Sequence, residues 1–88
     1  MKVVNLTYDS QTVDLDYHDF HKCTFNNCTL IYHGYGNIGL SECKINNCKW
    51  TFSDASVNTL KFMTLLYHNG GKELIESTFD NIRKGQHP

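Results

Sequence analysis

Large, mostly apolar residues recur at every fifth position through the middle of the chain. Divided into fives from Val13, residues 13–52 give eight units, and the third residue of each unit is large. These residues are Leu15, Phe20, Phe25, Leu30, Tyr35, Leu40, Ile45 and Trp50. Neither the 3.6-residue period of a helix nor the two-residue alternation of a strand produces this spacing. The pattern therefore predicts an internal repeat of short sides.

The four cysteines follow the same spacing. Cys23 and Cys28 are echoed twenty residues later by Cys43 and Cys48, in the segments CTFNNC and CKINNC. If four sides make one coil, each cysteine of the first pair lies over one of the second, at the spacing of neighbouring strands. The same stacking predicts five further pairs: Phe25 with Ile45, Leu30 with Trp50, Tyr32 with Phe52, Asn26 with Asn46 and Asn27 with Asn47.

The thiols themselves allow three interpretations. Interior packing is favoured, because the repeat gives each cysteine the place of a small, weakly polar core residue. A zinc site is the second, although zinc ligands more often have a two-residue spacing between cysteines. Disulfides are the third. We expect packing, and therefore neither a metal nor a cofactor.

Units such as CTFNN and CTLIY resemble those of the pentapeptide-repeat family. The resemblance implies a right-handed quadrilateral β-helix of about two coils over residues 13–52, with the first and third residues of each unit turned inward. Four first positions depart from the small residue that the family favours: Val13, His18, His33 and Ile38. The glycine-rich segment 33–39 is either a loop or two regular sides. A twisted antiparallel meander is the competing fold.

The five-residue spacing stops after Phe52, and two helices are expected to follow. Residues 53–56 offer N-cap side chains for a helix over 58–68, which Asn69-Gly70-Gly71 would end. A second helix is expected over 72–84. The predicted fold class is thus mainly β with α. A single domain of 88 residues would hold an N-terminal strand or cap (1–12), the β-helix coils (13–52) and a helical cap (53–88).

Composition narrows the function classes. With a net charge of −1, the chain has no excess of basic residues for binding a nucleic acid duplex. No apolar stretch approaches the roughly 20 residues that span a bilayer, and the start of the chain lacks a signal-peptide core. We therefore expect a cytoplasmic protein with reduced thiols. Open ends of a short β-helix favour strand pairing between subunits, so a homodimer is expected.

The first candidate site is the glycine-rich junction between the two helices. Its residues are Tyr67, His68, Asn69, Gly70, Gly71 and Lys72. Backbone N–H groups at a helix start, reached by a flexible turn and followed by a lysine, can bind a phosphate. The alternative is a helix–helix turn, in which the glycines form the C-cap and Lys72 is solvated.

Aromatic residues and a histidine form the second candidate site, made of Tyr32, His33, Tyr35 and Trp50. Such a group can stack on a purine or a nicotinamide-like ring. The alternative is that these side chains belong to the core or are ordinary surface residues. Motifs of hydrolases and metalloenzymes are missing from the sequence, so no catalytic residue is assigned. His68 with Glu73 or Glu76 can be drawn as an acid–base pair, as can be done in any small protein with five histidines.

Three function classes follow. The first is a non-catalytic binding protein for a nucleotide-like small molecule, the second a protein-interaction or inhibitor module using the β-helix faces, and the third a small nucleotide hydrolase. The chain is also similar to small bacterial and phage proteins with cysteine-rich repeats, an N-T-L helix, a glycine stretch and an L-I-E-x-T-F-x-x-I helix, here residues 58–60, 70–71 and 74–82. That similarity concerns the fold. We expect the first class, in the form of a phage counter-defence protein that sequesters a nucleotide-derived signal in the host cytoplasm.

Overall fold

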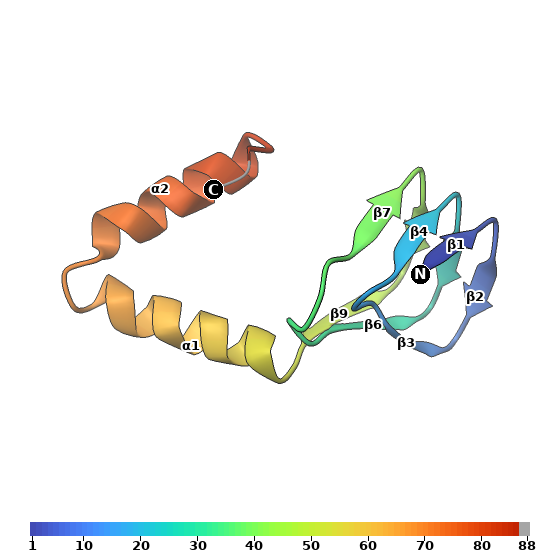
Figure 1. Cartoon of the computed structure of the whole chain (residues 1–88), viewed down its shortest axis with the longest axis horizontal. Helices are drawn as coiled ribbons and strands as arrows, with labels where there is room; N and C mark the ends of the chain where they lie inside the picture. The colour runs from blue at the N-terminus through green and yellow to red at the C-terminus, as the bar shows by residue number, and fades with distance from the viewer. Residues whose placement is uncertain (87–88) are drawn as a thin grey trace. The chain divides into compact units, whose positions relative to one another are not determined.

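The structure, a computed structural model, describes residues 1–86 as short strands followed by two helices (Figure 1). The strands are β1 (Lys2–Val4), β2 (Thr7–Asp9), β3 (Thr12–Asp14), β4 (Asp19–His21), β5 (Thr24–Asn26), β6 (Thr29–Tyr32), β7 (Gly39–Ser41), β8 (Lys44–Asn46) and β9 (Lys49–Phe52). The helices are α1 (Ala55–Tyr67) and α2 (Lys72–Arg83). The chain divides into two compact units, which we call the strand unit (Met1–Val57) and the helix unit (from Asn58 onward). Each is described by itself.

The strand unit consists of three stacked parallel sheets. Their strand orders are β1-β4-β7, β2-β5-β8 and β3-β6-β9, so each strand from β1 to β6 pairs with the strand three places further along the chain. The backbone therefore passes through three coils, β1–β3, β4–β6 and β7–β9 (Figure 1). This is a mixed fold of β-strands with two helices, and its stacked parallel strands are consistent with a β-helix-like solenoid. Parallel pairing does not fit the antiparallel meander.

The structure corrects the expected extent of the coils, because residues 1–12 are part of the stack and there are three coils instead of two. Lys2 pairs with Asp19, which in turn pairs with Gly39. The first repeat is thus 17 residues long and the second 20. Val13, not Leu15, is the central residue of its strand and pairs with Leu30. The shorter first repeat shifts the spacing by three residues, which the five-residue division from Val13 cannot show.

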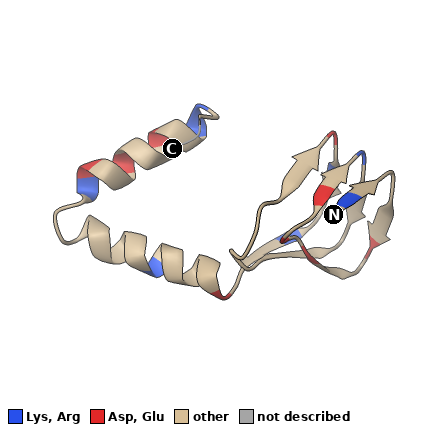
Figure 2. Ribbon diagram, in the orientation of Figure 1, with Lys and Arg blue, Asp and Glu red and all other residues tan. Residues whose placement is uncertain are grey.

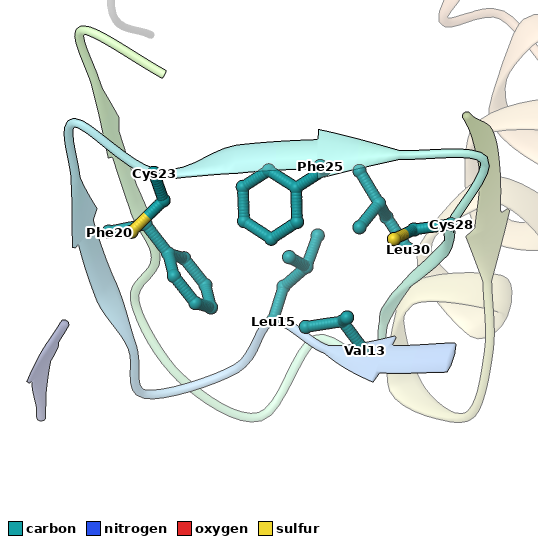
Figure 3. Packing of buried hydrophobic residues seen from close by; sticks show 7 residues of the cluster. All are labelled: Val13, Leu15, Phe20, Cys23, Phe25, Cys28 and Leu30. Atoms are coloured by element: carbon teal, nitrogen blue, oxygen red, sulfur yellow. The ribbon is translucent and has the colours of Figure 1, made fainter. Parts of the chain in front are cut away.

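The core lies within the first two coils. It contains Val13, Leu15, Phe20, Cys23, Phe25, Cys28 and Leu30 (Figure 3). The Phe25 ring stacks on Tyr8 of the first coil, with centroids 5.1 Å apart, and meets the edge of Phe20 at 5.2 Å. The third coil is less covered, since Trp50 is 52% exposed. The repeat thus buries its first two coils more completely than its last.

Most of the predicted stacking is confirmed. Phe25 pairs with Ile45, Leu30 with Trp50, and Tyr32 with Phe52. The Asn46 and Asn47 side-chain amides donate to Asn26 Oδ1 and Asn27 Oδ1, each at 2.8 Å. Asn27 and Asn47 occupy corners with φ of 54° and 53°, a left-handed conformation that asparagine tolerates better than most residues.

The cysteines are free thiols packed between coils. Cys23 and Cys28 are buried, while Cys43 and Cys48 are half-buried. Each thiol donates to a carbonyl of the preceding coil at 3.3–3.5 Å, at Val3, Tyr8, Phe20 and Phe25. Cys48 Sγ also accepts the backbone N–H of Cys28 at 3.4 Å. These contacts confirm the packing role.

The two helices occur where the sequence predicts them, although α1 begins three residues earlier than expected. The buried Ser56 explains this early start. Its hydroxyl accepts the Ser53 N–H at 2.9 Å and lies 2.8 Å from the Tyr32 carbonyl oxygen. The first turn of α1 is thereby tied to the end of β6. Among residues 1–86, neither helix has the length and apolar character needed to cross a membrane.

Candidate functional site

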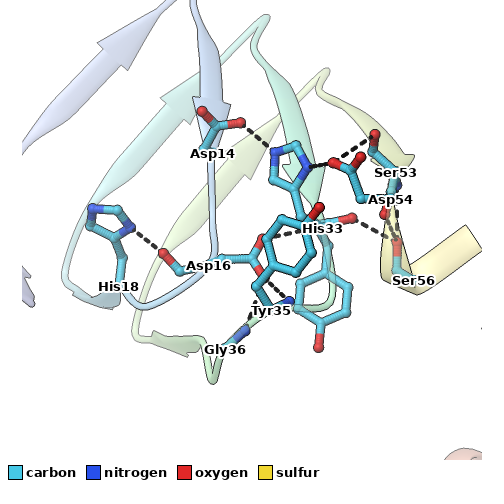
Figure 4. Close-up of polar contacts among 10 residues, drawn as sticks. Asp14, Asp16, His18, His33, Tyr35, Gly36, Ser53, Asp54 and Ser56 are labelled. Atoms are coloured by element: carbon cyan, nitrogen blue, oxygen red, sulfur yellow. Dashed lines mark hydrogen bonds and ion pairs between the residues drawn. The ribbon is translucent and has the colours of Figure 1, made fainter.

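The glycine-rich segment between β6 and β7 is a loop, residues 33–38, held by the carboxylate of Asp16 (Figure 4). Asp16 Oδ1 accepts the His33 N–H at 2.6 Å. Asp16 Oδ2 accepts the N–H groups of Tyr35 at 2.7 Å and Gly36 at 3.2 Å. Burial acts to raise the pKa of Asp16, but these three hydrogen bonds and the nearby His33 outweigh it, and the pKa is lowered. Asp16 is therefore an ionised anchor for the loop.

Two glycines allow the loop its close contacts. Gly34 has a φ of +82°, and a Cβ added there would lie 2.7 Å from the Ser56 backbone nitrogen. A Cβ on Gly36 would lie 2.2 Å from ring carbons of Tyr17. Larger residues would force the backbone or the ring to move. The loop is therefore fixed against both α1 and Tyr17.

His33 joins carboxylates from the first and third coils (Figure 4). Its Nε2 lies 2.8 Å from Asp14 Oδ1, and its Nδ1 lies 2.5 Å from Asp54 Oδ2. A neutral imidazole has one N–H, so it can donate to only one of the two carboxylates. Hydrogen bonds to Asp14 and Asp54 raise the pKa of His33, and this effect exceeds that of burial. The geometry therefore fits an imidazolium that donates to both acids.

This arrangement predicts a specific dependence of stability on pH. Because the folded-state pKa of His33 lies above 6.5, its stabilising contribution is complete below that pH and lost as the pH rises through the folded-state pKa. We expect the urea midpoint of the strand unit to fall as the pH rises from 6.5. In His33→Gln the fall should be smaller, while the control His68→Gln should keep the wild-type slope. A wild-type slope in His33→Gln would contradict the prediction.

Two grooves flank the loop. The first, which we call the Trp50 groove, has a volume of about 430 Å³ and is lined by Leu15, Tyr32, Asn37, Ile38, Trp50 and Phe52. Trp50 and Phe52 are more than half exposed, at 52% and 56%. The lining is predominantly apolar and contains three aromatic rings.

The second, which we call the Tyr17 groove, is larger and more polar. Its volume is about 740 Å³, and it is lined by Tyr17, His18, Asp19, Tyr35, Gly36, Asn37, Ile38 and Gly39. Asn37 and Ile38 belong to both grooves. Burial and the charge of Asp54 raise the pKa of Tyr35, so its hydroxyl stays protonated at neutral pH.

The predicted aromatic site is thus brought together in part. Tyr32 and Trp50 line the Trp50 groove and Tyr35 the Tyr17 groove. His33 lines neither groove, but its ring stacks on that of Tyr35 at 5.7 Å. Asp16 and Tyr17 were not predicted, and nothing in the sequence distinguishes them from the other aspartates and tyrosines, although Asp16 is buried. Their roles arise from pairing across coils.

The glycine junction in the helix unit has the geometry of a turn. Gly70 has a φ of +97°, and the Gly71 N–H donates to the Leu66 carbonyl at 2.8 Å, which closes α1. Lys72 Nζ lies 5.8 Å from the centre of the Tyr67 ring. The Asn69 side chain donates to the Leu65 carbonyl at 2.7 Å. The Gly71 N–H is therefore not available to bind a phosphate.

A small cavity of about 230 Å³ lies between α1 and α2. Its lining consists of Leu60, Met63, Thr64, Tyr67, His68, Ile75 and Phe79. Tyr67 and His68 are the two predicted site residues in this lining, which does not include Gly70, Gly71 or Lys72. The predicted ligand residues therefore fall into two groups, one in each compact unit.

Comparison of the chain with protein-family models, with curated proteins and with solved structures finds no match.

Proposed function

We propose that the protein is a non-catalytic binding protein for a small molecule with a planar ring. More specifically, we propose that the protein sequesters a nucleotide-derived signal, as the sequence predicts. The observation that carries the proposal is the Trp50 groove, in which exposed Trp50 and Phe52 and the half-buried Tyr32 surround about 430 Å³. This volume falls in the range of small-molecule sites, and aromatic faces stack on planar rings at about 1–3 kcal/mol per base.

The chemistry of His33 favours binding over catalysis. Both of its ring nitrogens face carboxylates at hydrogen-bonding distance, so the imidazolium has no lone pair with which to accept a proton. Because His33 bridges two coils, it holds in place the loop that separates the two grooves. Because this loop is already ordered in the free protein, its residues lose less conformational entropy when a ligand binds.

We also infer that the coils adopt the right-handed quadrilateral form of pentapeptide-repeat proteins. Support comes from the twenty-residue repeat between the second and third coils and from the three parallel sheets. Further support comes from left-handed corners at Lys22, Asn27, Glu42 and Asn47. Within residues 1–86, β7, β8 and β9 each pair with one neighbour, which leaves an edge at which a second copy could add.

Trp50 is the only tryptophan, so its fluorescence reports on the groove directly. Titration with adenosine, AMP and a nicotinamide nucleoside is expected to change Trp50 emission. Trp50→Ala should lower the affinity measured by calorimetry about tenfold, because one stacking face is lost. The matched control is Leu65→Ala, which truncates an exposed side chain of α1. Equal affinities in wild type and Trp50→Ala would contradict the assignment.

The same experiment separates the alternatives. Recovery of unaltered ligand after denaturation supports a binding protein, whereas altered ligand indicates the hydrolase. A protein partner is the second candidate, because Leu40, Trp50 and Phe52 of the third coil are exposed. Absence of a response to every ring-containing probe would favour that candidate over the proposed one.

A further inference from the structure

Two side chains that line the Tyr17 groove, those of Tyr17 and His18, offer hydrogen-bond acceptors to it. The Tyr17 hydroxyl donates its proton to the Tyr35 carbonyl oxygen at 2.7 Å, so its oxygen is left as an acceptor. His18 Nδ1 lies 2.7 Å from the Asp16 carbonyl oxygen (Figure 4). Because a carbonyl only accepts, Nδ1 carries a proton, and in that tautomer of the imidazole Nε2 is an acceptor.

Asp19 adds a negative charge to the same groove. Within residues 1–86 its carboxylate has neither an ion pair within 4.0 Å nor a side-chain hydrogen bond, although Lys2 is its neighbour across β1 and β4. The groove lining contains no Lys or Arg. Basic residues occur in both units (Figure 2). The N-terminal ammonium of Met1 donates to the Tyr17 carbonyl oxygen at 2.6 Å but does not line the groove. An anionic group inside the groove would therefore meet the charge of Asp19 with no cationic Lys or Arg side chain in the lining.

Two tyrosine rings supply the walls. Tyr17 and Tyr35 are 63% and 56% exposed and both line the groove. The negative face of a tyrosine ring attracts ammonium, guanidinium and related cations. The tyrosine rings and the unpaired carboxylate of this groove would both attract a planar cation.

Tyr17 is also held in a conformation that is unfavourable for a bulky residue. Its φ is 66°, in the left-handed region. Its N–H donates to the Asn37 carbonyl at 3.0 Å, and its ring lies over Gly36. Strain of this kind persists where the surrounding contacts fix it, and it is concentrated at binding sites. The wall of the groove is therefore fixed before any ligand arrives.

We infer that the Tyr17 groove selects ligands by charge, binding a planar cationic or donor-rich group and rejecting an anionic one. The inference rests on the proposed function, since Asn37 and Ile38 border both grooves. For a ligand whose first ring stacks in the Trp50 groove, it assigns a second planar group, such as a pyridinium or an amino-substituted base, to the Tyr17 groove. The phosphates of a nucleotide-derived ligand would lie outside it.

Three probes with the same ring and different charge test the inference: benzamidinium, benzamide and benzoate. Titrations followed by the amide NMR signals of Gly36 and Asn37 should show affinity in that order. Asp19→Asn should weaken benzamidinium about tenfold, because a charge-assisted hydrogen bond is lost, and leave benzamide unchanged. Glu73→Gln in α2 removes the same charge from the helix unit and should change neither affinity.

The outcomes separate the two proposals. Equal affinity for all three probes would overturn charge selection while leaving ring binding intact. Tightest binding of benzoate would also overturn it. Failure of every probe to shift either signal would overturn the Tyr17 groove as a binding site and leave ring binding in the Trp50 groove, which Trp50 fluorescence tests separately, intact. Equal weakening of benzamidinium in Asp19→Asn and Glu73→Gln would show a general charge effect and overturn the role of Asp19.

Discussion

Replacement of Phe25 by alanine is expected to lower the free energy of unfolding of the strand unit by about 3–5 kcal/mol, the cost of deleting a fully buried phenylalanine. The Phe25 side chain has no exposed surface. It stacks on Tyr8 of the first coil and pairs with Ile45 of the third, so its loss opens a void between coils. Domains of this size have only about 5–15 kcal/mol of stability, so a large fraction of it would be lost.

Urea denaturation followed by Trp50 fluorescence measures this effect within the strand unit. The matched control is Phe62→Ala, the same truncation at a side chain that is 60% exposed in α1. It should change stability by less than about 1 kcal/mol. A loss below about 1 kcal/mol in Phe25→Ala, or equal losses in the two variants, would contradict the packing described for the core.

The repeat made much of the fold predictable. A twenty-residue offset between like residues is enough to place Phe25 against Ile45 and Leu30 against Trp50. The first coil was missed because a three-residue shift occurs between Val13 and Phe20. A uniform division of residues 13–52 into fives makes Leu15 the central residue of a strand. In the structure, Leu15 lies in the corner after β3, where the first coil is shorter than the second. Leu15 and Val13 are both buried there, so hydrophobicity alone gives no warning of the shift.

The candidate site was predictable in its aromatic part. Tyr32 and Trp50 approach each other because their strands pair, which follows from the repeat. The carboxylates of Asp14 and Asp16 could not be placed, because their positions depend on the shortened first coil. At the glycine junction the sequence allowed a turn or an anion site. The bond from the Gly71 N–H to the Leu66 carbonyl satisfies the turn and takes up one backbone donor of the junction.

Replacement of Asp16 by alanine is expected to release the loop of residues 33–38 and to weaken binding in both grooves. The substitution leaves three backbone N–H groups, those of His33, Tyr35 and Gly36, without their acceptor. Each bond is made to a charged oxygen, and such bonds are stronger than neutral ones. Hydrogen exchange at these three amides should accelerate by at least about tenfold, because hydrogen bonds to charged groups are among the strongest in proteins.

Asp9→Ala is the matched control, since this exposed acid of β2 accepts one side-chain hydrogen bond, from Asn26, and does not touch the loop. The lowered pKa of Asp16 supplies a second test. The stabilisation it provides is present above the unfolded-state pKa and lost as the pH falls through the folded-state pKa. Acid should therefore accelerate wild-type loop exchange, beyond the chemical effect of pH, toward the Asp16→Ala rate. Unchanged exchange in Asp16→Ala, or equal acceleration in Asp9→Ala, would show that another contact holds the loop.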